Sequence, residues 1–303
     1  MYLEHFGLTE PPFSLTPDTS YFFSYGHYAD ALNTLLVALK TGEGFIKVTG
    51  EVGTGKTLLC RKLLNTLDEK FITAYIPNPM VTPYGLLTAV AEELGVKIDR
   101  HYGHHQLLKM ITERLIQFTT EGKRIVLCMD EAQAMSIETL ESLRLLTNME
   151  TEKNKLLQVV LFAQPELNDK LNCQEIRQLK QRITFSYTLE PIDKAGMASY
   201  VTHRLMTAGY QGGELFSVSA LNKLYKASRG IPRLINILSH KSMLVSYGKG
   251  DQHVSPVHMQ VAVKDTEDAQ LRPHLGQDMM QGGAWVAVSL ALAAIAGMLV
   301  QSA

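Results

Sequence analysis

The chain has 303 residues, which allows one large domain or two modest ones, and its 46% apolar content suits a globular protein with a full core. Its 29 lysines and arginines nearly balance its 30 aspartates and glutamates, and this balance argues against a protein whose whole surface binds nucleic acid. The three cysteines are far apart and lack metal-ligand spacing, which is typical of a reducing compartment and excludes a disulfide framework.

Residues 2–28 are rich in aromatic side chains and prolines and follow no helical or strand period. The prolines predict an extended segment laid across a surface. We expect some of its aromatic rings to contact the adenine of a nucleotide; the alternative is that they only pin the segment to the domain. No basic stretch followed by an apolar one opens the chain, so we expect no signal peptide.

The next stretch predicts a helix over residues 27–40, a buried strand over 45–49 and a second helix that follows it closely. Between this strand and helix lies G-x-x-x-x-G-K-T, the pattern of a phosphate-binding loop. Its glycines let backbone N–H groups point at an anion, and the positive end of the new helix faces the same point. We expect Lys56 at the β- and γ-phosphates of ATP and the Thr57 hydroxyl at Mg²⁺. The predicted nucleotide-binding residues are Gly50, Glu51, Val52, Gly53, Thr54, Gly55, Lys56, Thr57 and Leu58.

A strand over residues 71–76 and helices over 83–94 and 104–120 come next. No carboxylate or cysteine accompanies the histidines of this region, so a solvated loop is favoured over a metal site; they are His101, His104 and His105.

Residues 124–131 form a nearly continuous apolar run that ends in Asp130 and Glu131, as expected for a parallel strand buried on both faces. Open α/β sheets place their sites at the carboxyl ends of such strands. We therefore expect Asp130 to complete the Mg²⁺ shell and Glu131 to orient the attacking water or take its proton. The alternative is an acidic helix N-terminus, a common surface feature, but the phosphate loop favours the catalytic interpretation.

Gln164 lies at the end of another buried strand, where its amide could contact the γ-phosphate or the attacking water, or could be no more than a polar strand end. The alternation of strands and helices predicts an α/β fold with a parallel sheet and helices on both faces, in a P-loop domain spanning residues 1–192. The elements expected after residue 131 are a helix, a strand, a helix and a strand over residues 136–149, 156–163, 167–182 and 183–189.

From Asp193 the pattern changes to helices alone, which predicts a small all-helical lid domain over residues 193–264. Pro232 suits the first turn of a helix, which places Arg233 in that turn. Arg233 is then either a surface charge or a cation that reaches across the domain cleft to the phosphates. The expected helices cover residues 193–208, 217–228, 231–247 and 255–264.

Residues 265–283 are polar and contain proline and glycines, which is typical of a linker. Residues 284–300 carry no charge, and a helix of that length spans about 25 Å against a hydrocarbon core of ~30 Å. Trp285 suits an interface anchor. We predict a transmembrane helix over residues 284–300, with the ATPase domain on the cytoplasmic side of a bacterial inner membrane. The alternatives are a core helix or an amphipathic interaction helix, although the stretch is apolar all round.

The order of these motifs resembles the AAA+ ATPases: a phosphate loop, an Asp-Glu strand end, a polar strand end, an arginine-bearing helix and a helical lid with G-x-P-R. More narrowly, residues 1–265 resemble the ExeA/GspA type of general-secretion ATPase, on the motifs YLEHFGL, PPFSLTP, GEVGTGKT and DEAQ. Members with ExeA-like architecture carry a periplasmic peptidoglycan-binding region beyond the membrane span. This chain stops after the apolar segment, so the resemblance fits better a short relative associated with the mannose-sensitive haemagglutinin (MSHA) type IV pilus.

The resemblance implies ATP and Mg²⁺ as cofactors, Gln164 as the sensor at the strand end and Arg233 as the lid sensor. It implies Arg182 or Arg177 as a finger donated to a neighbouring subunit's nucleotide, where a cation on the transferring phosphoryl group raises the rate. It also implies a homo-oligomer in which hydrolysis shifts the lid. The implied partners are pilus or secretion assembly proteins and the inner membrane. We therefore expect a membrane-tethered ATPase that assists assembly of a type IV pilus or type II secretion apparatus.

Two other functions use the same domain type. A DNA-associated ATPase of the transposition or replication type would need a basic surface, which the composition does not indicate, so a nucleic-acid partner is disfavoured. A non-hydrolysing scaffold that reports the ATP state to partners would not need Glu131. GTP is disfavoured as the nucleotide because no N-K-x-D motif is present.

Overall fold

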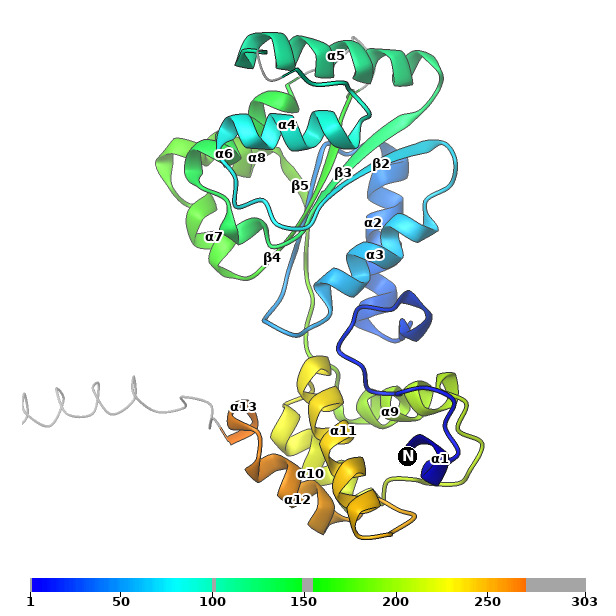
Figure 1. Cartoon of the computed structure of the whole chain (residues 1–303). Coiled ribbons are helices and arrows are strands. Elements are labelled where there is room, and N and C mark those ends of the chain that lie inside the picture. Colours follow the sequence, from blue (N-terminus) through cyan, green and yellow to red (C-terminus); the bar gives the residue numbers. More distant parts are fainter. Residues whose placement is uncertain (1, 100–101, 149–154, 271–303) are drawn as a thin grey trace, which may run out of the picture.

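The computed structural model describes residues 2–99, 102–148 and 155–270. Figure 1 shows two parts, an α/β domain built on one sheet and a helical domain. The helical domain lies at the edge of the sheet that carries the predicted phosphate loop, residues 50–57. The predictions that concern residues 271–300 and His101 lie outside the described residues.

A five-stranded sheet forms the α/β domain, in the order β2-β3-β4-β1-β5, and all its neighbouring strands are parallel. This confirms the predicted parallel sheet. Because β4 lies between β1 and β3, the carboxyl ends of these three strands lie next to one another at one edge. Their bounds are Phe45–Thr49 for β1, Phe71–Ile76 for β2, Arg124–Met129 for β3, Gln158–Ala163 for β4 and Ile183–Thr188 for β5.

Helices cover both faces of the sheet, because alternate strand residues point to opposite faces and are apolar on both. Val126 and Cys128 of β3 pack in one core with α2 and α3, whereas Ile125 and Leu127 pack in a second core with α4 to α8 (Figure 1). The first group is α2 (His27–Thr41) and α3 (Lys56–Thr66); the second is α4 (Pro83–Glu93), α5 (His104–Thr120), α6 (Ile137–Leu146), α7 (Glu166–Leu171) and α8 (Arg177–Arg182).

In the helical domain, local sequence signals mark where the helices begin. Asp193 and Ser217 each accept a hydrogen bond from a backbone N–H of the first turn that follows, and Pro232 opens the next long helix. Caps and apolar periodicity together explain why the expected helices agree with the observed ones to within a turn. These are α9 (Lys194–Thr207), α10 (Val218–Ser228), α11 (Pro232–Gly248) and α12 (Pro256–Lys264), with a short α13 (Glu267–Gln270) after them.

The N-terminal segment differs in part from the expected extended segment laid across a surface. Its first residues form a short helix, α1 (Tyr2–Phe6), that packs on α11 of the helical domain (Figure 1), and a single turn, η1 (Thr19–Tyr21), lies against α3. Gly7 ends α1 in the left-handed conformation, and Phe6 and Leu8 are buried. A helix this short shows no measurable period, so the pattern of the sequence could not reveal it.

The helix expected over residues 167–182 is also wrong as a single element. It breaks into α7, a turn η3 (Gln174–Ile176) and α8. Leu171, Ile176 and Leu179 are all buried in the second core. In one continuous helix, residues five apart point about 140° away from each other, so Leu171 and Ile176 could not both face that core. The break at Cys173, whose backbone is extended, lets both side chains be buried.

The polar stretch predicted as a linker from residue 265 begins as part of the helical domain. Asp265 forms an ion pair with Lys241 at 2.9 Å, and Thr266 is buried and donates to Ala262 O. Within residues 2–99, 102–148 and 155–270, no helix combines the length and apolarity needed to cross a bilayer.

Gly230 lies between α10 and α11, and replacing it should destabilise the fold. Its φ is +76°, and a Cβ there would lie 2.0 Å from the backbone oxygen of Ile192. Gly230→Ala should therefore lower the free energy of unfolding by about 3 kcal/mol, from left-handed strain plus a backbone clash. Denaturant unfolding measures this loss. Gly213→Ala is the control, because nothing lies within 4 Å of a Cβ at that exposed position; equal stability of the two variants would contradict the prediction.

Candidate functional site

The phosphate loop, Gly50 to Thr57, connects β1 to the start of α3 at the carboxyl edge of the sheet. Gly53 and Gly55 have φ angles of 81° and 92°, a left-handed conformation that favours glycine. A Cβ on Gly53 would also lie 2.7 Å from the Cβ of Arg233, so the loop packs directly against the helical domain. The loop therefore has the strand–loop–helix setting that an anion-binding nest needs.

Lys56 lies inside this loop and is only 5% exposed. Its ammonium donates to Gly50 O at 2.7 Å and to Glu51 O at 2.9 Å. Burial lowers the pKa of Lys56, and the nearby carboxylates of Glu131 and Asp130 oppose part of this shift. The side chain is a cation held at the phosphate loop by carbonyl dipoles and adjacent acids.

The end of β3 meets the start of α3 through one short hydrogen bond. The Thr57 hydroxyl donates to Asp130 Oδ2 at 2.6 Å, and Asp130 is 2% exposed. Burial raises the pKa of Asp130, while the hydrogen bond from Thr57 opposes the rise. A hydroxyl and a carboxylate are the hard oxygen donors that Mg²⁺ takes beside nucleotide phosphates, so the pair fits that ion.

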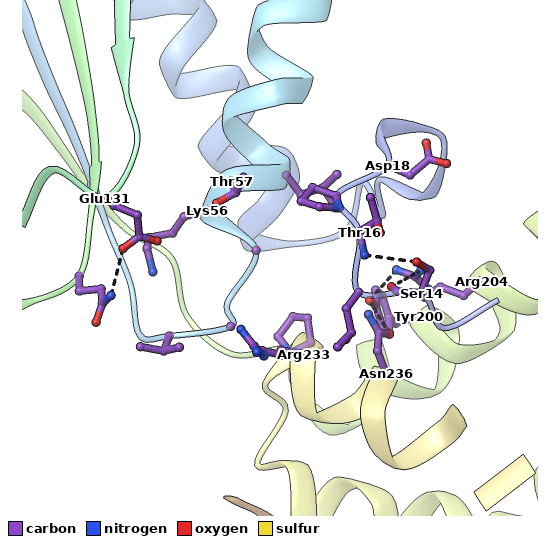
Figure 2. Close-up of a pocket in the computed structure, with 18 residues that line it drawn as sticks. Ser14, Thr16, Asp18, Lys56, Thr57, Glu131, Tyr200, Arg204, Arg233 and Asn236 are labelled. Atoms are coloured by element: carbon purple, nitrogen blue, oxygen red, sulfur yellow. Dashed lines mark hydrogen bonds between the residues drawn. The ribbon is translucent and has the colours of Figure 1, made fainter. Parts of the chain in front are cut away.

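Glu131 is held by two amide side chains from neighbouring strand ends. Its Oε2 accepts from Gln164 Nε2 at 3.1 Å and from Gln133 Nε2 at 2.5 Å, and Gln164 N donates to Gln133 Oε1 at 2.9 Å. Its φ of 54° turns the backbone sharply after β3. Figure 2 shows this carboxylate beside Lys56. The structure thus brings Gln164 to Glu131 and adds Gln133, whose role was not foreseen although it belongs to the DEAQ motif.

A cavity of about 370 Å³ lies beside these residues, between the two domains (Figure 2). The phosphate loop and α3 line it from one side and the helical domain from the other. Arg233 is among the lining residues, and its backbone N–H donates to Gly53 O at 3.1 Å. The predicted lid arginine therefore reaches the cavity. The residues that sequence reasoning did not select are Ser14, Leu15, Thr16, Pro17, Asp18, Tyr200, Arg204, Pro232 and Asn236.

The aromatic rings of the N-terminal segment do not line this cavity. Phe13 and Tyr21 are buried in the hydrophobic core. Phe22 and Phe23 line a smaller apolar cavity instead, together with Tyr28. Both cavities are bordered by the same four residues, Gly55, Leu58, Tyr200 and Pro232, so they are neighbours. The segment thus contributes residues 14–18 to the larger cavity and aromatic rings to its neighbour, and contact of these rings with adenine stays a prediction.

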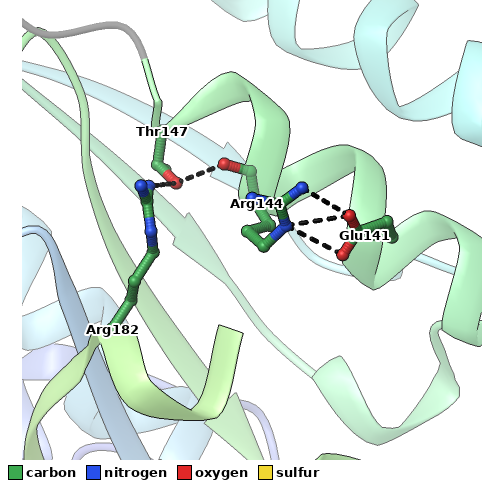
Figure 3. A network of polar contacts seen from close by, with 4 residues as sticks. All are labelled: Glu141, Arg144, Thr147 and Arg182. Atoms are coloured by element: carbon green, nitrogen blue, oxygen red, sulfur yellow. Dashed lines mark hydrogen bonds and ion pairs between the residues drawn. The ribbon is translucent and has the colours of Figure 1, made fainter. Parts of the chain in front are cut away.

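The two arginines considered as a finger lie away from the cavity of their own chain. Arg182 Nη1 donates to Thr147 Oγ1 at 3.4 Å, beside the bidentate pair of Arg144 with Glu141 (Figure 3). Arg177 lines a separate surface cavity near α7 and α8. Neither side chain belongs to the site of this chain.

The sequence did contain a signal for Arg204, one of the cavity residues that had not been predicted. Arg204 follows Met197, Tyr200 and Val201 at helical spacing, so it lies on the buried face of α9. A charged residue is rarely buried unless its donors are satisfied. An arginine on an apolar helical face is therefore a sign of a specific polar contact. Its partners, in the N-terminal segment, could not be read from the spacing.

Known proteins resemble this chain over part or nearly all of its length. Residues 39–171 match the family model described as an AAA domain. General secretion pathway protein A of Aeromonas hydrophila is 39% identical over 297 residues, which are 98% of this chain and 53% of that protein. The chain thus spans about half the length of this curated relative.

Solved structures share the fold at low identity. Cdc6p of Pyrobaculum aerophilum superposes with a TM-score of 0.65 at 18% identity, over 82% of this chain and 70% of that one. The ORC2 protein of Aeropyrum pernix, solved as ADPNP and ADP complexes, gives 0.61 at 18% over 84% and 73%. The RuvB branch migration motor of Thermotoga maritima gives 0.54 at 15% over 81% and 70%. Likeness at this identity concerns the fold alone. Residues 39–171 therefore match an AAA domain, and the chain is similar over nearly all its length to General secretion pathway protein A.

Proposed function

We propose that this chain is an ATPase that binds ATP with Mg²⁺ and hydrolyses its terminal phosphoanhydride bond. The observation that carries the proposal is the hydrogen bond of 2.6 Å between Thr57 and Asp130, which joins the phosphate loop to the adjacent strand end. Lys56 lies within this loop and Glu131 follows Asp130 directly. A cation, a pair of metal-ligand oxygens and a carboxylate for water are the groups that phosphoryl transfer to water requires.

The groups of the site divide the tasks of the proposed reaction. The loop amides and Lys56 bind the phosphates, and Thr57 and Asp130 hold Mg²⁺, which neutralises charge on the phosphate oxygens when bound. Glu131, oriented by Gln133 and Gln164, aligns the attacking water and takes its proton. In the same proposal, Gln164 contacts the terminal phosphate, and Arg233 brings a cation from the helical domain.

We further propose that hydrolysis serves the assembly of a type IV pilus or type II secretion apparatus at the bacterial inner membrane. The 39% identity to General secretion pathway protein A supports a role in secretion. The uncharged segment 284–300 supports a membrane tether with the ATPase domain in the cytoplasm. Within this group we favour the MSHA pilus biogenesis protein MshM as the counterpart. Arg182 or Arg177 then serves a neighbouring copy in a homo-oligomer.

Lys56→Ala tests nucleotide binding. Removing a buried ammonium from the phosphate contacts should weaken affinity for ATP roughly tenfold or more. Equilibrium binding of labelled ATP in the presence of Mg²⁺ measures the change. Lys109→Ala is the matched control, because Lys109 is exposed on α5 and pairs with Glu113 on that helix. Unchanged binding by Lys56→Ala would remove the nucleotide site from the phosphate loop.

Glu131→Gln separates binding from hydrolysis. The variant should retain ATP and lose turnover by about a hundredfold or more, because an amide cannot take the proton of water. Release of phosphate at saturating ATP gives the rate. Glu113→Gln, which changes an exposed carboxylate on α5, should leave the rate unaltered. An unchanged rate in Glu131→Gln would remove the proton-accepting role from Glu131, whereas a wild-type chain that binds ATP and releases no phosphate would favour the non-hydrolysing scaffold.

Deleting residues 284–303 tests the tether. The full chain expressed in bacteria should sediment with membranes and resist a carbonate wash, because a spanning helix is not released by charge or pH. The shortened chain should stay in the supernatant. Recovery of the full chain in the soluble fraction would rule out the membrane anchor while leaving the ATPase proposal intact.

A further inference from the structure

The segment from Thr9 to Thr19, here called the strap, is attached to both domains. At its first end, Thr9 donates through both its N–H and its hydroxyl to Ala208 O at 2.9 Å, just after α9. Phe13 packs edge-to-face on Phe216, with ring centroids 6.1 Å apart. This end of the strap belongs with the helical domain.

The second end of the strap is attached to the α/β domain. Arg61 of α3 donates from Nη1 to Pro17 O at 3.0 Å, and Asn65 of α3 donates to Thr19 Oγ1 at 3.2 Å. Both side chains lie on the helix that begins at the phosphate loop. The residues between the attachments, 14–18, line the cavity of the site, and Figure 2 shows Ser14, Thr16 and Asp18 along its edge.

Arg204 of α9 is a further attachment of the strap to the helical domain. Arg204 is 4% exposed, and its guanidinium donates to Pro12 O at 2.5 Å and to Ser14 O at 3.2 Å. It also lies over the ring of Tyr21, 4.6 Å from the centroid. Burying a cation is costly unless its donors are satisfied. In the described part of the chain no carboxylate forms an ion pair with Arg204, so the strap carbonyls and aromatic faces satisfy it.

The same arginine extends into the wall of the cavity. Arg204 Nη1 donates to Tyr200 OH at 3.1 Å, and Tyr200 OH donates to Asn236 Oδ1 at 3.0 Å. All three side chains line the cavity. In Figure 2 they form a group with the strap that lies apart from the group around Lys56 and Glu131. The cavity therefore has a phosphate end and a second end made by the strap and the helical domain.

We propose that Arg204 is a positioning residue that holds strap residues 14–18 as the wall for the base and ribose of the bound nucleotide. The proposal rests on the proposed ATP site and deepens it. A nucleotide in the cavity then contacts a segment fastened to both domains, so occupancy of the site joins the helical domain to the α/β domain. Arg204 acts through the strap carbonyls and not on the reacting phosphate.

The test compares ATP with inorganic tripolyphosphate, which has the phosphates but neither base nor ribose. Arg204→Met in the full chain should weaken binding of ATP by about tenfold, because a charged hydrogen-bond donor to the strap is lost, and should leave tripolyphosphate binding within about twofold. Lys56→Ala should weaken both ligands alike. Competition against a labelled nucleotide, with Mg²⁺ present, measures the affinity of the wild type and of both variants for ATP and for tripolyphosphate.

The matched control is Arg114→Met. Arg114 also donates from Nε to a main-chain carbonyl, Leu94 O at 3.1 Å, and lies 4.1 Å from the ring centroid of Phe118, on α5. Arg114→Met should change the affinity for neither ATP nor tripolyphosphate. Arg61→Met removes one of the two hydrogen bonds from α3 to the strap, at an exposed position. It therefore tests the proposal without opening a buried space, and it should also weaken binding of ATP but not of tripolyphosphate.

The outcomes separate the two proposals. Equal loss of both ligands, or loss of neither, in a folded Arg204→Met variant overturns the role of Arg204. If that variant does not fold, Arg61→Met decides in the same way. A wild-type chain that binds tripolyphosphate but shows no added affinity for ATP overturns the strap proposal alone. A wild-type chain that binds neither ligand overturns the proposed ATPase.

Discussion

The hydrogen bond between Thr57 and Asp130 depends on the whole architecture of the sheet. The two residues are 73 positions apart, and they meet because β1 and β3 flank β4 and end at the same edge. Both strands are apolar on two faces, so helices must cover both sides and only the edge remains open for polar groups. Polar side chains at this edge therefore converge, and a buried cation beside buried acids becomes affordable only because each partly neutralises the other.

The second half of the site follows a different rule. The strap is held beside the cavity through main-chain carbonyls, which accept from the buried Arg204 of the helical domain and from the exposed Arg61 of the α/β domain. Every residue type has a main-chain carbonyl oxygen. These contacts therefore fix where the strap lies but place few demands on which residues it contains. This explains how a proline-rich stretch without periodic structure becomes an ordered wall, while its aromatic ring, Phe13, packs in the core.

Prediction from sequence succeeded where one local period decides the structure. The buried strands before Gly50 and Gln164, and the capped helices after residue 193, agree with the structure because burial on a face and a cap at each start specify them locally. It failed where burial of particular side chains overrides a period. Leu171 and Ile176 could share one core only if the helix broke, and the five residues of α1 are too few to show a pattern.

The sequence alone determined the phosphate loop, the acid pair after β3 and the parallel sheet, because each depends on neighbours within a few residues and on alternation along a strand. The tertiary structure decided which side chains join them. Gln133 orients Glu131, Arg204 fastens the strap, and Arg182 lies outside the cavity of its own chain. These placements depend on packing between segments far apart along the chain, and spacing along a sequence carries no record of which distant carbonyl or carboxylate a side chain will meet.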